Sequence, residues 1–74
     1  MKISRFRKGC YIITLHGHSF TLEKLSDDRN WTLYNARDTE ISRVETKGGM
    51  IELMQSWSPE YTATKAAIDF CIYA

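Results

Sequence analysis

The segment from Cys10 to Lys24 constrains the fold more than any other part of the chain, because two runs rich in β-branched and aromatic residues flank a turn signal. His16 and Gly17 lie at its centre, and glycine readily adopts the positive φ that a two-residue hairpin turn requires. Side chains alternate between the two faces of a strand, so this turn fixes which residues share a face. The resulting register gathers five apolar side chains on one surface by pairing Leu15 with His18, Ile13 with Phe20 and Tyr11 with Leu22.

The two histidines, His16 and His18, also raise the alternative of a metal site. Zinc sites use three or four ligands at diagnostic spacings, and the nearest further candidates are Cys10, Asp27 and Asp28. Cys10 belongs to the far end of the first strand. The sequence therefore favours a hairpin turn over a metal centre, and we expect no bound metal.

Two further strands follow a polar cluster of turn-forming residues at positions 25–30. One is predicted over Trp31–Asn35 and the other over Glu40–Thr46. Ile41 and Val44 have opposite parity, which predicts a β-bulge or an early end to pairing. These segments predict an antiparallel meander of three to four strands.

The periodicity changes to a helical one after Thr46, since four apolar residues recur at helical spacing: Met50, Leu53, Met54 and Trp57. We expect this helix to start near Lys47 or at Gly49 and to cover the apolar face of the sheet. Ser58 and Pro59 then predict a second helix that runs to about Ile72, although residues 59–72 would also suit a segment that is partly strand. The predicted fold class is α+β, with one or two C-terminal helices packed on one face of the meander.

The first eight residues carry four cations and no anion. Gly9 separates them from the first patterned segment, so we expect residues 1–8 to form a flexible basic arm and residues 9–74 to form a single small domain. Residues 9–74 hold six cations and nine anions, a net charge of −3. The basic segment supplies the candidate binding residues, which are Lys2, Arg5, Phe6, Arg7 and Lys8.

Catalysis is not predicted, because no catalytic constellation can be assembled from this sequence. Asp27 and Asp28 lie in a polar loop where solvation keeps carboxyl groups ordinary. Cys10 and Cys71 are widely separated and are expected to be free thiols, with a disulfide as the alternative. We expect no cofactor and no membrane association, since no apolar run approaches the roughly 18 residues of a bilayer span. Cytoplasmic residence is the default expectation.

Residues 31–54 read W-T-L-Y-N-A-R-D-T-E-I-S-R-V-E-T-K-G-G-M-I-E-L-M, a Trp-x-Leu-Tyr strand, a turn, a second strand and a Thr-Lys helix start. This pattern is similar to one found in short phage-encoded proteins. Together with the length and the basic arm, it resembles small phage regulators that bind host machinery, such as inhibitors of bacterial RNA polymerase. The chain departs from that pattern at Gly48 and Gly49, where the helix start is weakened. No binding residue is carried over from the resemblance.

The resemblance implies a phage-type accessory protein that binds a host protein complex, most plausibly RNA polymerase, in the bacterial cytoplasm and alters transcription by occupying a surface. The basic arm would order on an acidic or nucleic-acid-lined surface, and ordering it costs conformational entropy. Two alternatives stay open, namely a small autonomous nucleic-acid-binding domain and a phage inhibitor of a host defence complex. A homodimer closed through the uncharged segment F-C-I-Y-A at positions 70–74 is compatible with each.

Overall fold

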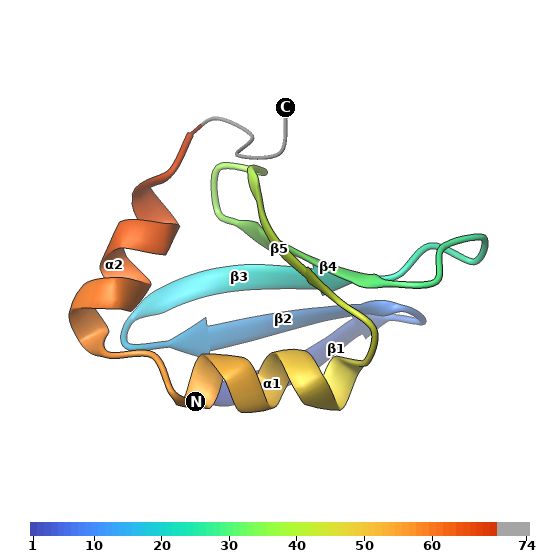
Figure 1. Cartoon of the computed structure of the whole chain (residues 1–74), viewed down its shortest axis with the longest axis horizontal. Coiled ribbons are helices and arrows are strands. Elements are labelled where there is room, and N and C mark those ends of the chain that lie inside the picture. The colour runs from blue at the N-terminus through green and yellow to red at the C-terminus, as the bar shows by residue number, and fades with distance from the viewer. Residues whose placement is uncertain (70–74) are drawn as a thin grey trace.

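A five-stranded antiparallel meander forms the centre of the molecule, with two helices after it (Figure 1). The computed structural model describes residues 1–69. Neighbouring strands in the chain are neighbours in the sheet, in the order β1-β2-β3-β4-β5. The elements are β1 (Lys2–Arg7), β2 (Cys10–Leu15), β3 (His18–Glu23), β4 (Trp31–Asn35), β5 (Glu40–Val44), α1 (Lys47–Gln55) and α2 (Pro59–Ala67). The predicted α+β class, with helices after the meander, is confirmed, and the sheet has one strand more than expected.

The central hairpin has the predicted turn and the predicted register. His16 and Gly17 both have positive φ, 49° and 81°, the combination that matches the twist of two paired strands. The three predicted pairs are all present between β2 and β3, including Ile13 opposite Phe20. His16 also makes a tertiary contact, because its Nε2 donates a hydrogen bond to the Trp57 carbonyl oxygen at 3.1 Å. This histidine therefore links the tip of the hairpin to the segment between the helices.

The expectation of a flexible arm over residues 1–8 was wrong. Residues Lys2–Arg7 form β1, which pairs with β2 at one edge of the sheet. All six of its residues are exposed. The segment therefore lacks the alternation of apolar and polar residues by which a half-buried strand is recognised in a sequence. Gly9, with φ 77°, makes the turn into β2 and so connects the two strands, whereas the sequence analysis took it as a separator.

The irregularity predicted in the strand over Glu40–Thr46 is a β-bulge in β5. Leu33 pairs with Ser42 and Tyr34 pairs with Glu40, so Ile41 is the extra residue on β5. The bulge turns the Ile41 side chain into the core, where 2% of the residue is exposed. Val44, two residues beyond Ser42, then packs against the same core, which reconciles the opposite parity of the two apolar positions.

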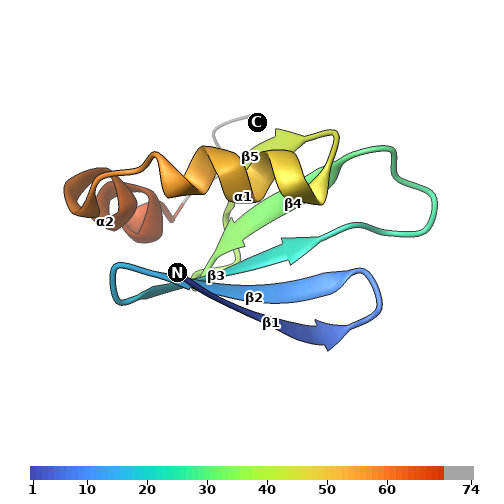
Figure 2. The same ribbon diagram turned by 90° about the horizontal axis from the view of Figure 1, so that it is seen from below.

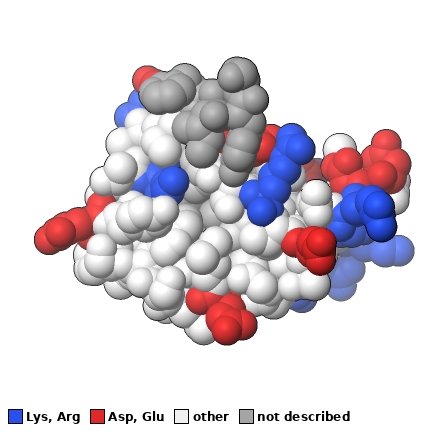
Figure 3. Space-filling model, in the orientation of Figure 1, with Lys and Arg blue, Asp and Glu red and all other residues white. Residues whose placement is uncertain are grey.

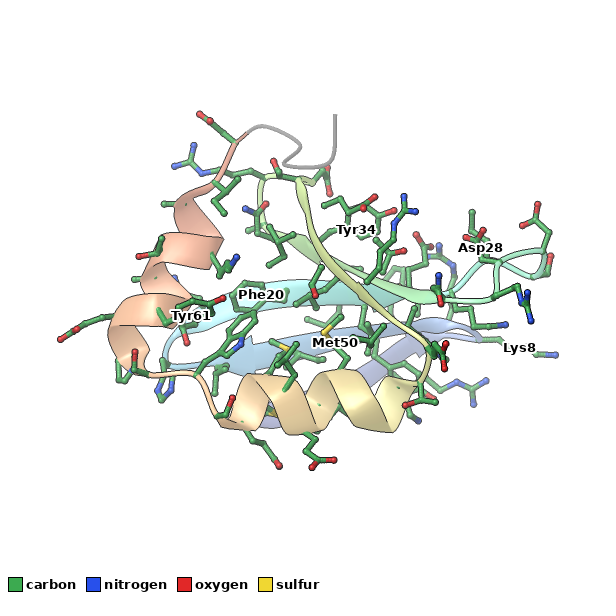
Figure 4. All side chains as sticks on the ribbon, viewed as in Figure 1. Lys8, Phe20, Asp28, Tyr34, Met50 and Tyr61 are labelled. Atoms are coloured by element: carbon green, nitrogen blue, oxygen red, sulfur yellow. The ribbon has the colours of Figure 1, made fainter. Side chains whose placement is uncertain are left out.

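Both helices lie on the same face of the sheet (Figure 2). The core lies between the sheet and the helices. It is formed by strand residues on this face and by residues that follow β5, namely Ile13, Leu15, Phe20, Leu22, Leu33, Ile41, Met50, Met54 and Trp57. Figure 4 shows Phe20 and Met50 pointing toward this layer. Thr46 caps α1 by accepting a hydrogen bond from the Gly49 amide, which offsets the weak helix start at the two glycines.

Helix α2 is shorter than predicted, and one residue of the apolar stripe predicted for α1 is exposed. Ser58 caps α2 and Pro59 opens it as predicted, but the described helix ends at Ala67 rather than near Ile72. Thr62 is the buried residue of α2. Leu53, in the predicted apolar stripe of α1, is 42% exposed. The segment 70–74, with Cys71 and Ile72, lies outside the described residues.

Asn35 at the end of β4 joins the sheet to α2. Its side-chain Nδ2 donates to the carbonyl oxygens of Lys65 and Ile68, at 3.0 and 2.6 Å. Its Oδ1 accepts from the amides of Arg37 and Thr39, at 2.9 and 3.1 Å, within the β4–β5 turn. The residue is 1% exposed, and these four hydrogen bonds use the full capacity of its amide. One side chain thus satisfies both a tight turn and the open carbonyls at a helix end.

Replacing Asn35 with alanine tests this link. The change leaves two amides and two carbonyls without their partner, so we expect Asn35→Ala to lower the free energy of unfolding by about 2–4 kcal/mol. Urea denaturation followed by circular dichroism measures the difference. Asn30→Ala, in an exposed loop, is the control and should change stability by less than about 0.5 kcal/mol. Equal stability of the two variants would show that Asn35 does not hold α2 to the sheet.

Candidate functional site

The predicted binding residues lie on or beside β1, where the sheet distributes them over two faces. Arg5 is opposite Tyr11 in the register, on the face that carries the helices. Lys2 is opposite Thr14 and therefore on the other face. Lys8 lies in the turn between β1 and β2, and Figure 4 shows it at one end of the molecule. The five predicted residues therefore do not form one continuous surface.

Phe6 is presented to solvent by a second β-bulge. Arg5 and Arg7 pair with the adjacent residues Tyr11 and Cys10, so Phe6 is the extra residue on β1. Its exposed fraction is 66%, the largest of the exposed large apolar residues described. The Arg7 guanidinium carbon lies 5.5 Å from the centre of its ring, and the same guanidinium forms an ion pair with Glu23. Phe6 is therefore exposed on the edge strand, while Arg7 beside it is held by Glu23 of β3.

A pocket of about 510 Å³ opens between the β1–β2 turn and the loop that follows β3. We call it the basic pocket, because all charged residues that line it are cations. Its lining residues are Arg5, Lys8, Gly9, Tyr11, Lys24, Leu25, Ser26 and Trp31. Figure 3 shows lysine and arginine atoms gathered at this end of the molecule, beside acidic atoms of the same end. Two of the predicted binding residues, Arg5 and Lys8, are brought together here.

Two aromatic rings contribute to the wall of the basic pocket. Tyr11 and Trp31 have ring centres 6.0 Å apart at an interplanar angle of 50°, and both are half-buried against the core. Lys47, at the start of α1, places its Nζ 4.2 Å from the centre of the Tyr11 ring and donates to the Tyr11 hydroxyl at 3.2 Å. The core and Lys47 thus hold Tyr11 in place, which gives the pocket a positioned aromatic side.

Gly9 fixes the distance between the two chain segments that form the pocket. Its carbonyl oxygen accepts a hydrogen bond from the Lys24 amide at 2.9 Å. A Cβ at position 9 would lie 2.8 Å from the Lys24 carbonyl oxygen, closer than a real Cβ contact. Only glycine therefore combines this positive φ with this close approach. The contact brings the backbones of Lys8 and Lys24 to the same rim.

The cations of the basic pocket differ from Arg7, Arg37 and Arg43 in their partners. Arg7, Arg37 and Arg43 form ion pairs with carboxylates. Arg5, Lys8 and Lys24 form no ion pair within residues 1–69. Three like charges are thus held around one opening without a compensating anion, although their mutual repulsion is unfavourable. Such a rim attracts anions.

The opposite face of the sheet, away from the helices, carries a different group around Tyr34. Burial raises the pKa of the Tyr34 phenol, and the carboxylates of Glu40 and Glu23 raise it further. Glu40 holds the Arg43 guanidinium in a two-point contact, at 3.0 and 2.7 Å, which raises the pKa of Arg43. Since tyrosine is protonated at neutral pH even with its ordinary pKa of 10.0, the effect of this raised pKa is confined to alkaline pH.

The part of the chain that the structure describes contains no group of three His, Cys, Asp or Glu side chains placed to hold a metal ion. Neither of its helices is long and apolar enough to cross a membrane. We compared the chain with known protein families, with curated protein sequences and with solved structures, and none of these comparisons gave a match. These comparisons therefore assign no family and no function to the chain.

The sequence analysis missed Tyr11, Lys24 and Trp31 as members of a site. It placed Tyr11 correctly on the apolar face of the hairpin, but it did not pair Arg5 with it, because residues 2–7 were not recognised as a strand. The signal that was present is Gly9, whose spacing from β2 fits a second tight turn as well as it fits a linker. Two consecutive turns would have predicted the meander through β1.

The raised pKa of Tyr34 predicts a stability change at alkaline pH. The folded state holds the phenol proton to higher pH than the unfolded state, in which tyrosine titrates near its ordinary value of 10.0. This contribution to stability is full below pH 10 and is lost as pH rises through the folded pKa. We expect Tyr34→Phe to reduce the fall in the free energy of unfolding above pH 10, as measured by urea denaturation at a series of pH values. Tyr61→Phe, at an exposed tyrosine of α2, is the matched control, and an equal effect of both changes would contradict the role of the surroundings of Tyr34.

Proposed function

We propose that this protein is a small regulatory binding protein that occupies a surface of a larger protein complex and contacts it through β1. The observation that carries the proposal is the exposed edge strand itself. Within residues 1–69, β1 pairs on one side only, so alternate backbone amides and carbonyls on its outer side are available to an extended segment of a partner. Phe6 is exposed on this edge strand, and aromatic residues are enriched at protein interfaces.

The charge of β1 supports an acidic partner surface. Lys2, Arg5 and Arg7 lie within the strand and Lys8 follows it, whereas residues 9–74 have a net charge of −3. Two copies of β1 paired with one another would bring like charges together, which disfavours self-association through this edge. An acidic segment would gain from the same charges, chiefly in association rate and in orientation.

Bacterial RNA polymerase is the first target to test, because the chain resembles small phage regulators of host machinery. The mechanism would be stoichiometric: a bound copy blocks a surface that transcription requires. Removing residues 2–8 is not a clean test, since the deletion takes away a strand of the sheet and uncovers the edge of β2. Substitution of a single exposed side chain leaves the sheet intact.

The test measures binding of the purified protein to nuclease-treated bacterial RNA polymerase by biolayer interferometry, together with inhibition of run-off transcription. We expect Phe6→Ala to weaken binding by about tenfold or more and to weaken inhibition in parallel, because truncation of an interface anchor commonly costs more than 1 kcal/mol. Leu53→Ala is the matched control, since Leu53 is also an exposed apolar residue but belongs to α1.

Three results would contradict the proposal. Equal loss of affinity in Phe6→Ala and Leu53→Ala would show that β1 is not the contacting element. Absence of binding by the unmodified protein would exclude RNA polymerase as the target, and absence of inhibition despite binding would exclude the blocking mechanism.

A further inference from the structure

The basic pocket combines two kinds of wall that few ligands satisfy together. Tyr11 and Trp31 supply aromatic surface, and Arg5, Lys8 and Lys24 supply positive charge from three different chain segments. Its volume, about 510 Å³, is much larger than an inorganic anion needs. A ligand that fits both walls carries a flat aromatic group and a negative charge a few bonds apart.

The three cations are free to meet such a ligand. They form no ion pair within the described residues 1–69, although carboxylates partner other arginines of the same sheet. The Gly9–Lys24 backbone contact holds two of the three chain segments in place, so the positive rim is built before any ligand arrives. A rim that is assembled in advance reduces the ordering cost of binding.

The aromatic side of the basic pocket is also held in place before a ligand binds. Tyr11 is fixed by the core and by Lys47, whose Nζ lies 4.2 Å from the centre of the ring, and Trp31 packs against the tilted Tyr11 ring. Bases stack on aromatic side chains with little dependence on sequence, while cations follow the phosphates. Lys47 covers Tyr11, so the Trp31 indole is the natural stacking surface.

We propose that the basic pocket binds one nucleotide unit of a single-stranded nucleic acid, with its base against Trp31 and its phosphate on Arg5, Lys8 and Lys24. The pocket lies on the helix-bearing face of the sheet, whereas Phe6 projects from its edge. The inference is therefore independent of the regulatory function proposed above, and either one can fail alone.

Trp31 provides the readout, because the chain contains only two tryptophans. In the full-length Trp57→Phe protein, Trp31 fluorescence is titrated with a short single-stranded oligonucleotide, with a mononucleotide and with inorganic phosphate. We expect quenching by the oligonucleotide and weaker quenching by the mononucleotide. Three phosphate contacts to a single strand predict that the logarithm of the binding constant falls with that of the salt concentration at a slope of about −2.

Point variants locate the binding in the pocket. Arg5→Ala and Lys24→Ala should each weaken oligonucleotide binding and make the salt slope shallower by about 0.7. Lys2→Ala is the matched control, since Lys2 lies on the same strand as Arg5 but on the opposite face of the sheet. Because Trp57 belongs to the core, the amide chemical shifts of Gly9 and Lys24 in the otherwise unmodified protein give a second measure that does not need the Trp57→Phe change.

Several outcomes would overturn the inference. Equal weakening by Lys2→Ala and Arg5→Ala would indicate general attraction to the basic strand and no pocket site. Quenching by a phosphotyrosine peptide but not by the oligonucleotide would assign the pocket to a protein ligand. Absence of both quenching and amide shifts with the oligonucleotide would exclude a nucleic-acid ligand. The same variant distinguishes the two proposals. If the basic pocket does not bind nucleic acid but Lys24→Ala still binds RNA polymerase, the pocket proposal fails and the regulatory proposal stands.

Discussion

The register of the β2–β3 hairpin is the constraint on which the rest of the structure depends. A shift of one residue would move Ile13, Phe20 and Leu22 from the buried face to the other face of the sheet. The positive φ of both His16 and Gly17 prevents that shift by fixing a two-residue turn. Each neighbouring strand then takes its register from this hairpin, since the sheet is a meander without crossovers.

The two bulges adapt the regular sheet to its two tasks. On β5 the bulge turns the Ile41 side chain into the core, which also contains residues of α1. On β1 the bulge leaves Phe6 unpaired in solvent, where the core gains nothing from it. A β-bulge thus completes the core at one edge of the sheet and exposes Phe6, the proposed binding residue, at the other.

The two proposed contacts are both basic but lie at different places on the sheet. The outer edge of β1 offers backbone groups, Phe6 and a basic character to a protein partner, while the basic pocket offers aromatic surface and cations without ion-pair partners within residues 1–69. Arg7 is held by Glu23, but Arg5 two residues earlier lies over the pocket. Simple alternation would place these two arginines on the same face, so it is the β-bulge at Phe6 that directs them to different faces of the sheet.

The sequence by itself determined the fold class, the hairpin register, the irregularity at Ile41 and the cap of α2, because each depends on residues close together in the chain. It did not determine that residues 2–7 form a strand, since all six side chains are exposed and the pairing with β2 comes from backbone hydrogen bonds that no side-chain pattern encodes. It did not reveal the role of Asn35, because two of its four side-chain hydrogen bonds join the β4–β5 turn to the end of α2, some 30 residues later. The basic pocket likewise exists only in the tertiary structure, where β1, the first turn, the loop after β3 and the start of β4 meet.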